Sequence, residues 1–181
     1  MKEGKRPNGV SIIVTCREQQ PELMRLLPEL LSVQYSGDCE VIVVDEIHDR
    51  DMEKWLEEME QHYPQLCHTF CSATARGINI RRLALTLGAK ASSSEWLAIL
   101  SADTVLPGAD WLYSLTSCCK GDIDMVKGTK GRRPWFTFRN LFRRHVSLFS
   151  PTSSILLCRR SKVLESGSGL VPKKRVARVS L

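Results

Sequence analysis

The sequence contains no long hydrophobic run. No segment of the 181-residue chain approaches the roughly 18 uninterrupted apolar residues that a membrane-spanning helix needs. The apolar run near the start, VSIIVTC, stops at Arg17 and is too short for the core of a secretory signal. Hydrophobic and charged contents of 43% and 25% are those of an ordinary globular domain. These observations predict a cytoplasmic protein.

The motifs of several common sites are also missing. Seven cysteines occur without the paired Cys-x-x-Cys spacing of a zinc site, which favours free thiols in a reducing compartment. No Gly-x-x-x-x-Gly-Lys loop is present, and no Gly-x-Gly-x-x-Gly follows the first apolar run. P-loop and dinucleotide-binding folds are therefore disfavoured. The Gly-x-Ser-x-Gly elbow of many hydrolases is absent as well.

Acidic residues are scarce in the last third of the chain. Residues 127–181 hold 14 Lys and Arg and a single acid, Glu165, for a net charge of +13, whereas residues 1–126 sum to −7. A basic segment of this size is typical of proteins that bind phosphate, anionic lipid or nucleic acid. A solvated basic face without a partner is the alternative.

Short apolar runs alternate with amphipathic stretches over the first 130 residues. Strands are predicted at 10–14, 40–45, 66–70 and 95–100, and helices at 23–31, 52–59 and 80–91. Continuous apolar strands separated by helices predict an α/β sandwich of the nucleotide-binding kind, with a mostly parallel central sheet and helices on both faces.

Three polar groups follow the ends of predicted strands. They are the segment TCRE after the first strand, Asp45-Glu46 after the second, and Ser101-Ala102-Asp103 after the last. Ligands bind beyond the carboxyl ends of parallel strands, and acidic groups gathered there suit a divalent cation and, through it, a diphosphate. Each group taken alone also fits a helix cap or a turn.

Three segments, taken in order, resemble a known family. VSIIVTCRE, LLPELLSVQYSGDCEVIVVDE and LALTLGAKASSSEWLAILSADTVLPGADWL are similar to the opening strand, the Val-Val-Asp-Asp strand with its preceding helix, and the Asp-x-Asp segment of the family 2 inverting glycosyltransferases, which have the GT-A fold. The part ALTLGAKA resembles a bacterial branch of that family. The resemblance runs from about Val10 to Leu115 and more loosely to Glu165.

The resemblance implies a function and a set of site residues. It implies transfer of a sugar from a UDP- or GDP-linked donor to a glycan or lipid-linked acceptor, as in polysaccharide biosynthesis, with inversion and with help from Mg²⁺ or Mn²⁺. The nucleotide-binding positions that it implies are Thr15, Glu18, Asp45, Glu46, Arg81, Arg82 and Ser101, and the metal-binding position is Asp103.

The sequence also departs from the family pattern. Ser101 replaces the first Asp of Asp-x-Asp, and Cys16-Arg17 replaces Tyr-Asn. An inverting transfer needs a carboxylate base, which the family carries beyond a segment similar to SSILLCRRSKVLESGSG, and no acid follows Glu165 here. The chain is thus short of the usual catalytic-base region, and the base candidates are Asp122, Asp124 or an unrecognised group.

Two hypotheses stay open. One is an active, compact transferase. The other is a degenerate or truncated domain that acts as a membrane- or partner-docking module.

The basic segment contains one amphipathic pattern, WFTFRNLFRRHVSLF. Its aromatic residues recur at helical spacing, and its arginines face elsewhere: Trp135, Phe138, Phe142, and Arg139, Arg143, Arg144. This pattern is typical of an interfacial helix, and it predicts peripheral contact with the anionic inner face of a membrane, where an acceptor would be met. Packing of the aromatic stripe on the sheet is the alternative. No RNA-binding motif accompanies the segment, so nucleic acid is not expected.

These patterns divide the chain into four parts. We expect a flexible N-terminus at 1–9, a nucleotide-sugar-binding core at 10–130, a basic aromatic acceptor-side or interfacial segment at 131–169, and a flexible basic tail at 170–181.

Overall fold

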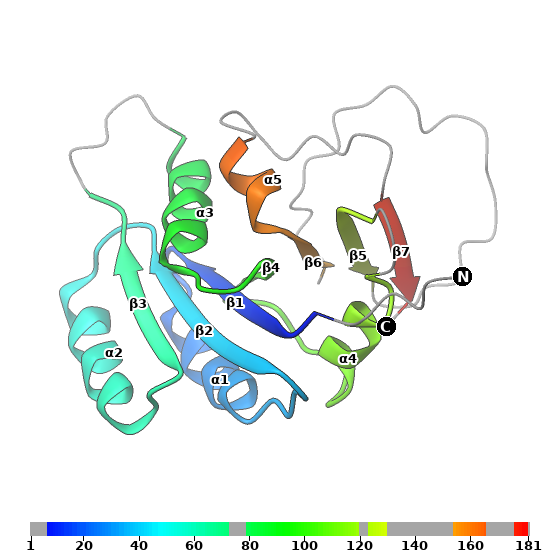
Figure 1. Cartoon of the computed structure of the whole chain (residues 1–181). Coiled ribbons are helices and arrows are strands. Elements are labelled where there is room, and N and C mark those ends of the chain that lie inside the picture. The colour runs from blue at the N-terminus through cyan, green and yellow to red at the C-terminus, as the bar shows by residue number, and fades with distance from the viewer. Residues whose placement is uncertain (1–6, 73–78, 120–122, 130–153, 166–175, 181) are drawn as a thin grey trace, which may run out of the picture.

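A computed structural model describes five ranges of the chain, 7–72, 79–119, 123–129, 154–165 and 176–180. The elements follow one another in the order β1 (Gly9–Cys16), α1 (Gln20–Leu31), β2 (Asp38–Asp45), α2 (Arg50–His62), β3 (Leu66–Phe70), α3 (Ile80–Ala91), β4 (Trp96–Ser101), α4 (Trp111–Thr116), β5 (Met125–Thr129), β6 (Ser154–Arg159), α5 (Arg160–Glu165) and β7 (Val176–Ser180) (Figure 1).

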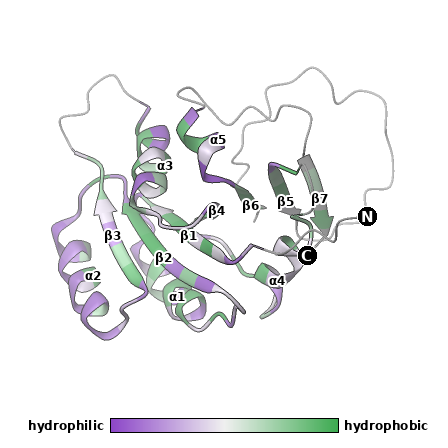
Figure 2. Ribbon diagram, in the orientation of Figure 1, coloured by the Kyte–Doolittle hydropathy of each residue, from purple (hydrophilic) through white to green (hydrophobic). Residues whose placement is uncertain are grey.

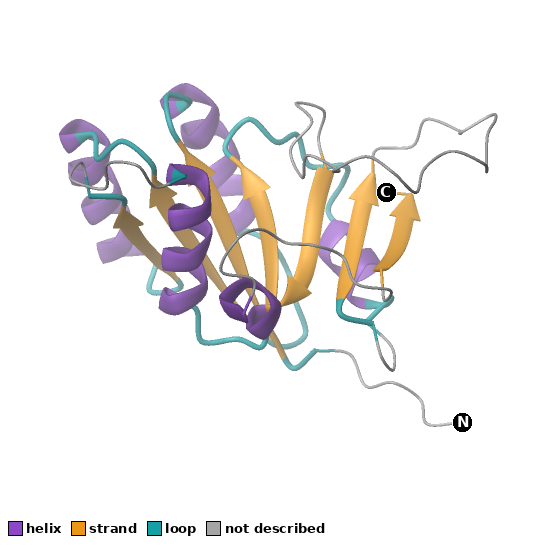
Figure 3. Cartoon of the chain, turned by 90° about the horizontal axis from the view of Figure 1, so that it is seen from above, coloured by secondary structure: helices purple, strands orange, loops and turns teal. Residues whose placement is uncertain are grey.

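The described strands form one seven-stranded sheet in the order β3-β2-β1-β4-β6-β5-β7 (Figure 3). Strands β3, β2, β1 and β4 run parallel, β6 is antiparallel to both of its neighbours, and β7 is parallel to β5. The predicted α/β architecture with a mostly parallel sheet is thereby confirmed. Strand β3 and helix α3 begin and end at the predicted residues.

Helices cover both faces of the sheet. Helices α1, α2 and α4 pack on one face and α3 and α5 on the other (Figure 1). Successive side chains of a strand point to opposite faces, so Ile12 and Val14 of β1 join the first core and Ile13 joins the second. Helices cover both faces, which is why the central residues of β1, β2 and β4 are mostly apolar on both sides, while α2 keeps a polar outer surface (Figure 2).

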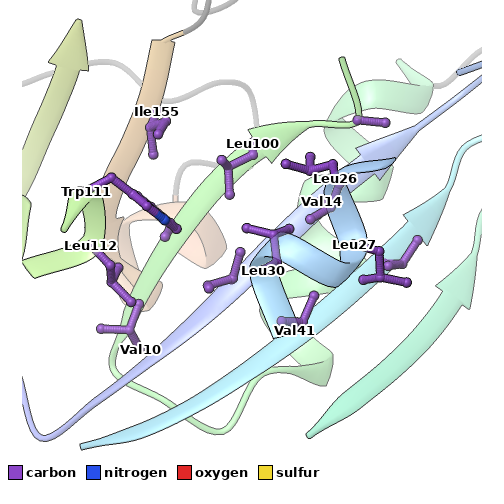
Figure 4. Packing of buried hydrophobic residues seen from close by; sticks show 14 of the residues in the cluster. Val10, Val14, Leu26, Leu27, Leu30, Val41, Leu100, Trp111, Leu112 and Ile155 are labelled. Atoms are coloured by element: carbon purple, nitrogen blue, oxygen red, sulfur yellow. The ribbon is translucent and has the colours of Figure 1, made fainter. Parts of the chain in front are cut away.

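The first core is built from leucines of α1 and from the start of α4 (Figure 4). Leu26, Leu27 and Leu30 recur at helical spacing and are at most 1% exposed. Trp111 and Leu112 begin α4 and are 2% and 1% exposed. Burial of these side chains holds α1 and α4 against the sheet.

On the other face, α3 approaches the sheet closely at Gly88. A Cβ atom at this position would lie 2.8 Å from Cγ2 of Ile13 and 3.2 Å from Cγ2 of Val44. Both neighbours are fully buried and, being β-branched, have little rotamer freedom with which to yield. The absence of a side chain at Gly88 therefore sets the distance between α3 and strands β1 and β2.

Near the amino ends of β1, β2 and β4, one carboxylate joins three segments. Oε1 of Glu40, on β2, accepts hydrogen bonds from Oγ of Ser11 on β1 and from N and Oγ of Ser93, the latter two at 2.7 and 2.8 Å. Burial acts to raise the pKa of Glu40, but the hydrogen bonds from Ser11, Ser93 and Ser94 outweigh it, and the pKa lies below its ordinary value.

Several further predictions can be compared with the described residues. All seven cysteines are described and are free thiols, as predicted. None of the helices in the described ranges has the length and apolarity that crossing a bilayer requires.

The C-terminal part of the chain differs from its prediction. In place of a flexible tail, residues 176–180 form β7, which pairs with β5. Strand β6 also belongs to this sheet, and helix α5 follows it directly. An edge strand of this kind gives no turn or charge signal that separates it from a solvated tail.

We expect Gly88→Ala to destabilise the protein by up to about 2 kcal/mol. Alanine favours a helix over glycine by roughly 1 kcal/mol, but overpacking against Ile13 and Val44 costs about 1–3 kcal/mol. Urea unfolding gives the free energy directly. Lys90→Ala, at an exposed position of the same helix, should change it by less than about 0.5 kcal/mol. A more stable Gly88→Ala variant would show that α3 can move away from the sheet without loss.

Glu40→Gln should lower the free energy of unfolding by about 1 kcal/mol at neutral pH, because a half-exposed charged acceptor is lost. The pKa of Glu40 is lowered in the fold, so its stabilisation is complete above the unfolded pKa and is lost as the pH falls through the folded one. The difference between variant and wild type should therefore vanish in acid. Urea unfolding at several pH values measures it, with exposed Glu57→Gln as control; a pH-independent difference would contradict the assignment.

Candidate nucleotide-binding pocket

The strand register brings three polar strand ends to the same edge of the sheet. In the parallel pairing of β1 with its neighbours, Cys16 lies opposite Asp45 of β2, and Thr15 lies opposite Ser101 of β4. The strand order reverses direction between β1 and β4, because β2 and β3 extend to one side and β4 to the other. Crevices at such a switch point are where open α/β sheets bind ligands.

A pocket of about 320 Å³ opens at this switch point. Residues from four parts of the chain line it: Thr15, Arg17, Gln19, Glu46, Asn79, Ile80, Arg81 and Ser101. Its floor is thus made by the ends of β1 and β4, and one wall by the start of α3. Two arginines and one carboxylate make it a charged site, suited to a polar ligand.

Helix α3 begins at the wall of the pocket. The side chain of Asn79 caps the helix, with Oδ1 accepting the N–H of Arg82 at 3.1 Å. This cap fixes where the first turn starts and so places Arg81 in the lining. The amino end of a helix also carries partial positive charge, which adds to that of the arginine.

The charged groups of the pocket influence one another. Burial raises the pKa of Glu46, while the guanidinium groups of Arg81 and Arg17 act to lower it and the carboxylate of Asp45 adds to the rise. Burial lowers the pKa of Arg81, against the opposing effect of Glu46 and Asp103. The negative charges of Glu46 and Asp103 therefore act on the guanidinium of Arg81.

Asp45 acts on the loop beside the pocket. It is 3% exposed, and its two oxygens accept the backbone N–H groups of Ile47 at 2.9 Å and Asp49 at 2.6 Å. This turn contains His48 with a φ of 56°, a left-handed conformation that is uncommon for a residue other than glycine. The ring of His48 stacks on Phe70 with centroids 3.7 Å apart. Asp45 thus shapes the loop and does not line the pocket itself.

The segment after β4 forms a compact turn. The N–H of Ser101 donates to Oγ1 of Thr104 at 3.2 Å, and the N–H of Thr104 donates to the carbonyl oxygen of Ser101 at 2.9 Å. Thr104 is only 4% exposed. Ser101 lines the pocket, whereas Asp103, two residues later in the turn, is exposed and is not part of the lining.

The structure thus brings together four of the eight positions implied for nucleotide and metal. Thr15, Glu46, Arg81 and Ser101 line the pocket, whereas Glu18, Asp45, Arg82 and Asp103 do not. Glu18 and Arg82 are exposed.

The other four lining residues are not among the positions predicted from the sequence to bind a ligand: Arg17, Gln19, Asn79 and Ile80. Asn79 carried a usable signal. It directly precedes a helical stripe, as an N-cap does, and that helix follows a strand ending at the same edge.

One candidate base, Asp124, lies away from the pocket. Asp124 directly precedes β5, and its Oδ1 lies 3.6 Å from Nε of Arg159, which pairs with Trp96 at the start of β4. It therefore lies at the edge opposite the pocket. Glu165 lies at the end of α5, where Oε2 accepts from Nζ of Lys162 at 3.2 Å. Asp122 lies outside the described residues.

The predicted membrane surface also lies outside the described residues, and it stays a prediction. This applies to Trp135, Phe138, Arg139, Phe142, Arg143 and Arg144.

The fold is similar to that of several solved structures. The chain superposes on the mannosyltransferase PcManGT from Pyrobaculum calidifontis, solved in complex with GDP-Man and Mn²⁺, with a TM-score of 0.63 and 18% identity over 97% of this chain and 57% of that one. S. aureus TarS 1-349 gives a TM-score of 0.66 with 16% identity over 95% and 58% of the two chains. Its complex with UDP-GlcNAc gives 0.63 and 16% over 95% and 56%.

At these identities the likeness establishes the fold, and the chain spans less than three fifths of each of these solved structures. A search of the curated proteins gives no match. The model of the family described as "Glycosyl transferase family 2", however, matches residues 11–168, which include most of the sheet and every residue of the pocket lining. The chain therefore belongs to glycosyl transferase family 2 and has its GT-A fold.

Proposed function

We propose that the pocket binds a UDP- or GDP-linked sugar and that the chain transfers the sugar, with inversion, to a glycan or lipid-linked acceptor. Membership of the family supports nucleotide-sugar glycosyl transfer. The donors named for the neighbours, GDP-Man and UDP-GlcNAc, belong to those proteins and serve here as probes.

One observation carries the proposal. Thr15 and Ser101, opposite each other in register, lie in a single pocket with Arg17 and Arg81. Hydroxyl groups can hydrogen-bond a ribose or a phosphate oxygen, and guanidinium groups bind phosphates with their planar pair of N–H donors. This combination suits a nucleoside diphosphate better than an apolar ligand, since guanidinium groups in a pocket lining complement the charge and the acceptor oxygens of phosphates.

A divalent cation is the cofactor that the resemblance implies, and the residues at this edge fit it poorly. Position 101 carries a hydroxyl in place of a carboxylate, and the charge of Asp103 interacts with the positive charge of Arg81. In the described ranges, no group of three or more His, Cys, Asp or Glu side chains is gathered in a way that would hold a metal ion. Mg²⁺ and Mn²⁺ prefer several oxygen ligands, carboxylates among them. We therefore propose that the donor is bound without an intervening metal ion, by the side chains of Thr15, Glu46, Arg81 and Ser101.

A second candidate is a domain that binds the nucleotide without transferring the sugar. Glu46 is the one carboxylate in the lining as far as the described residues go, and Asp124 lies at the opposite edge. An inverting transfer needs a base on the acceptor side. The two candidates differ in one measurement: a transferase releases nucleoside diphosphate from a bound donor in the presence of acceptor, and a binding domain does not.

Filling the pocket should weaken donor binding. Ser101→Tyr places a ring in a space of about 320 Å³ and should weaken the binding of UDP-GlcNAc or GDP-Man by about tenfold or more. Isothermal titration calorimetry with Mn²⁺ present measures this, and circular dichroism checks that the fold is kept.

Gln61→Tyr is the matched control, because Gln61 is exposed on α2 near the other edge of the sheet. It should bind as wild type. Equal affinity of Ser101→Tyr and wild type would place the donor elsewhere, and failure of the wild type to bind either donor would count against both candidates.

A further inference from the structure

We infer that Arg17 and Arg81 neutralise the diphosphate of the bound nucleotide, so that nucleoside diphosphate binding to this pocket does not require a divalent cation. The inference rests on the proposed function and concerns how the same pocket balances the charge of its ligand.

The two arginines come from separate elements and line the same pocket. Arg17 follows directly on β1, and Arg81 is the second residue of α3. The backbone N–H of Arg17 donates to Oε1 of Gln19 at 3.1 Å, and the Asn79 cap fixes the first turn that carries Arg81. Both backbones are thus held by local hydrogen bonds. Two guanidinium groups anchored at different points provide enough donors for the oxygens of two linked phosphates.

The carboxylates near the pocket interact electrostatically with these arginines. Glu46 is influenced by both Arg17 and Arg81, and Asp103 by Arg81. A metal ion bound at Asp103 would feel repulsion from the positive charge of Arg81, because the two side chains interact electrostatically. The position that supplies a second carboxylate in the family pattern is Ser101, which brings no negative charge to offset that repulsion.

Arg81 therefore supplies at this edge the charge that an ion would otherwise bring. An arginine side chain is effectively always protonated in proteins, and its guanidinium offers directed hydrogen bonds to phosphate oxygens. Fixed positive groups of this kind also stabilise the negative charge that develops on a departing diphosphate. With both arginines in its lining, the pocket can balance the charge of a diphosphate without a divalent metal ion.

Titration of the whole chain with UDP and with GDP, once in excess EDTA and once in excess Mn²⁺, tests the inference. We expect binding of at least one nucleotide in EDTA, with a dissociation constant within about threefold of that in Mn²⁺. Arg81→Ala and Arg17→Ala should each weaken binding in EDTA by about tenfold or more, since each removes charge-assisted hydrogen bonds to phosphate.

Arg25→Ala is the matched control, because Arg25 is exposed on α1, on the other face of the sheet from α3. It should bind the nucleotide as wild type, and thermal unfolding of all variants identifies any loss caused by misfolding.

Two results would count against the inference, and they differ in what else they affect. Binding that appears only with Mn²⁺ and is unchanged in Arg81→Ala overturns the arginine assignment and leaves the proposed function standing. Absence of binding for UDP and GDP in both conditions overturns the proposed function and, with it, this inference.

Discussion

The site depends on the shared register of β1, β2 and β4. Because these strands are parallel and aligned, their carboxyl ends come to one edge, where Thr15 faces Ser101 and Cys16 faces Asp45. A shift of one residue in any pair would turn every side chain of that strand to the opposite face. Both faces of β1 are buried under different helices, and Glu40 joins the strands near their other ends. The core therefore fixes the geometry of the pocket without any contribution from the ligand.

Helix α3 is the second determinant, because it connects the packing of the core with the charge of the pocket. Its contact with Ile13 and Val44 at Gly88 sets its height above the sheet, and its cap at Asn79 sets where it begins. Since the helix is a rigid rod of three turns, these two points determine where Arg81 lies. A residue that never touches a ligand, Gly88, thus takes part in placing one that lines the pocket.

The fold could be predicted from the sequence to a large extent, and the site only in part. Strands buried on both faces and helices with one apolar stripe leave strong periodic signals, so β3 and α3 were located to the residue. The role of Asp45 could not be predicted, because the hydrogen bonds of its oxygens to Ile47 and Asp49 depend on a turn with a left-handed residue. The position of Asp124 depends on β5 running parallel to β4, which follows from tertiary pairing and not from local pattern.

The placement of Glu46 shows how binding and stability oppose each other here. Its carboxylate is buried enough that its pKa is raised despite two neighbouring guanidinium groups, so the ionised form is held at a cost to the fold. The same carboxylate shares the pocket lining with Arg17 and Arg81 and offsets part of their positive charge. A diphosphate brings more negative charge than Glu46 does and would further favour the neutral form of that side chain. The guanidinium groups of Arg17 and Arg81 would then interact mainly with the phosphates. The electrostatic balance of the lining would thus shift from Glu46 toward the ligand when a diphosphate binds.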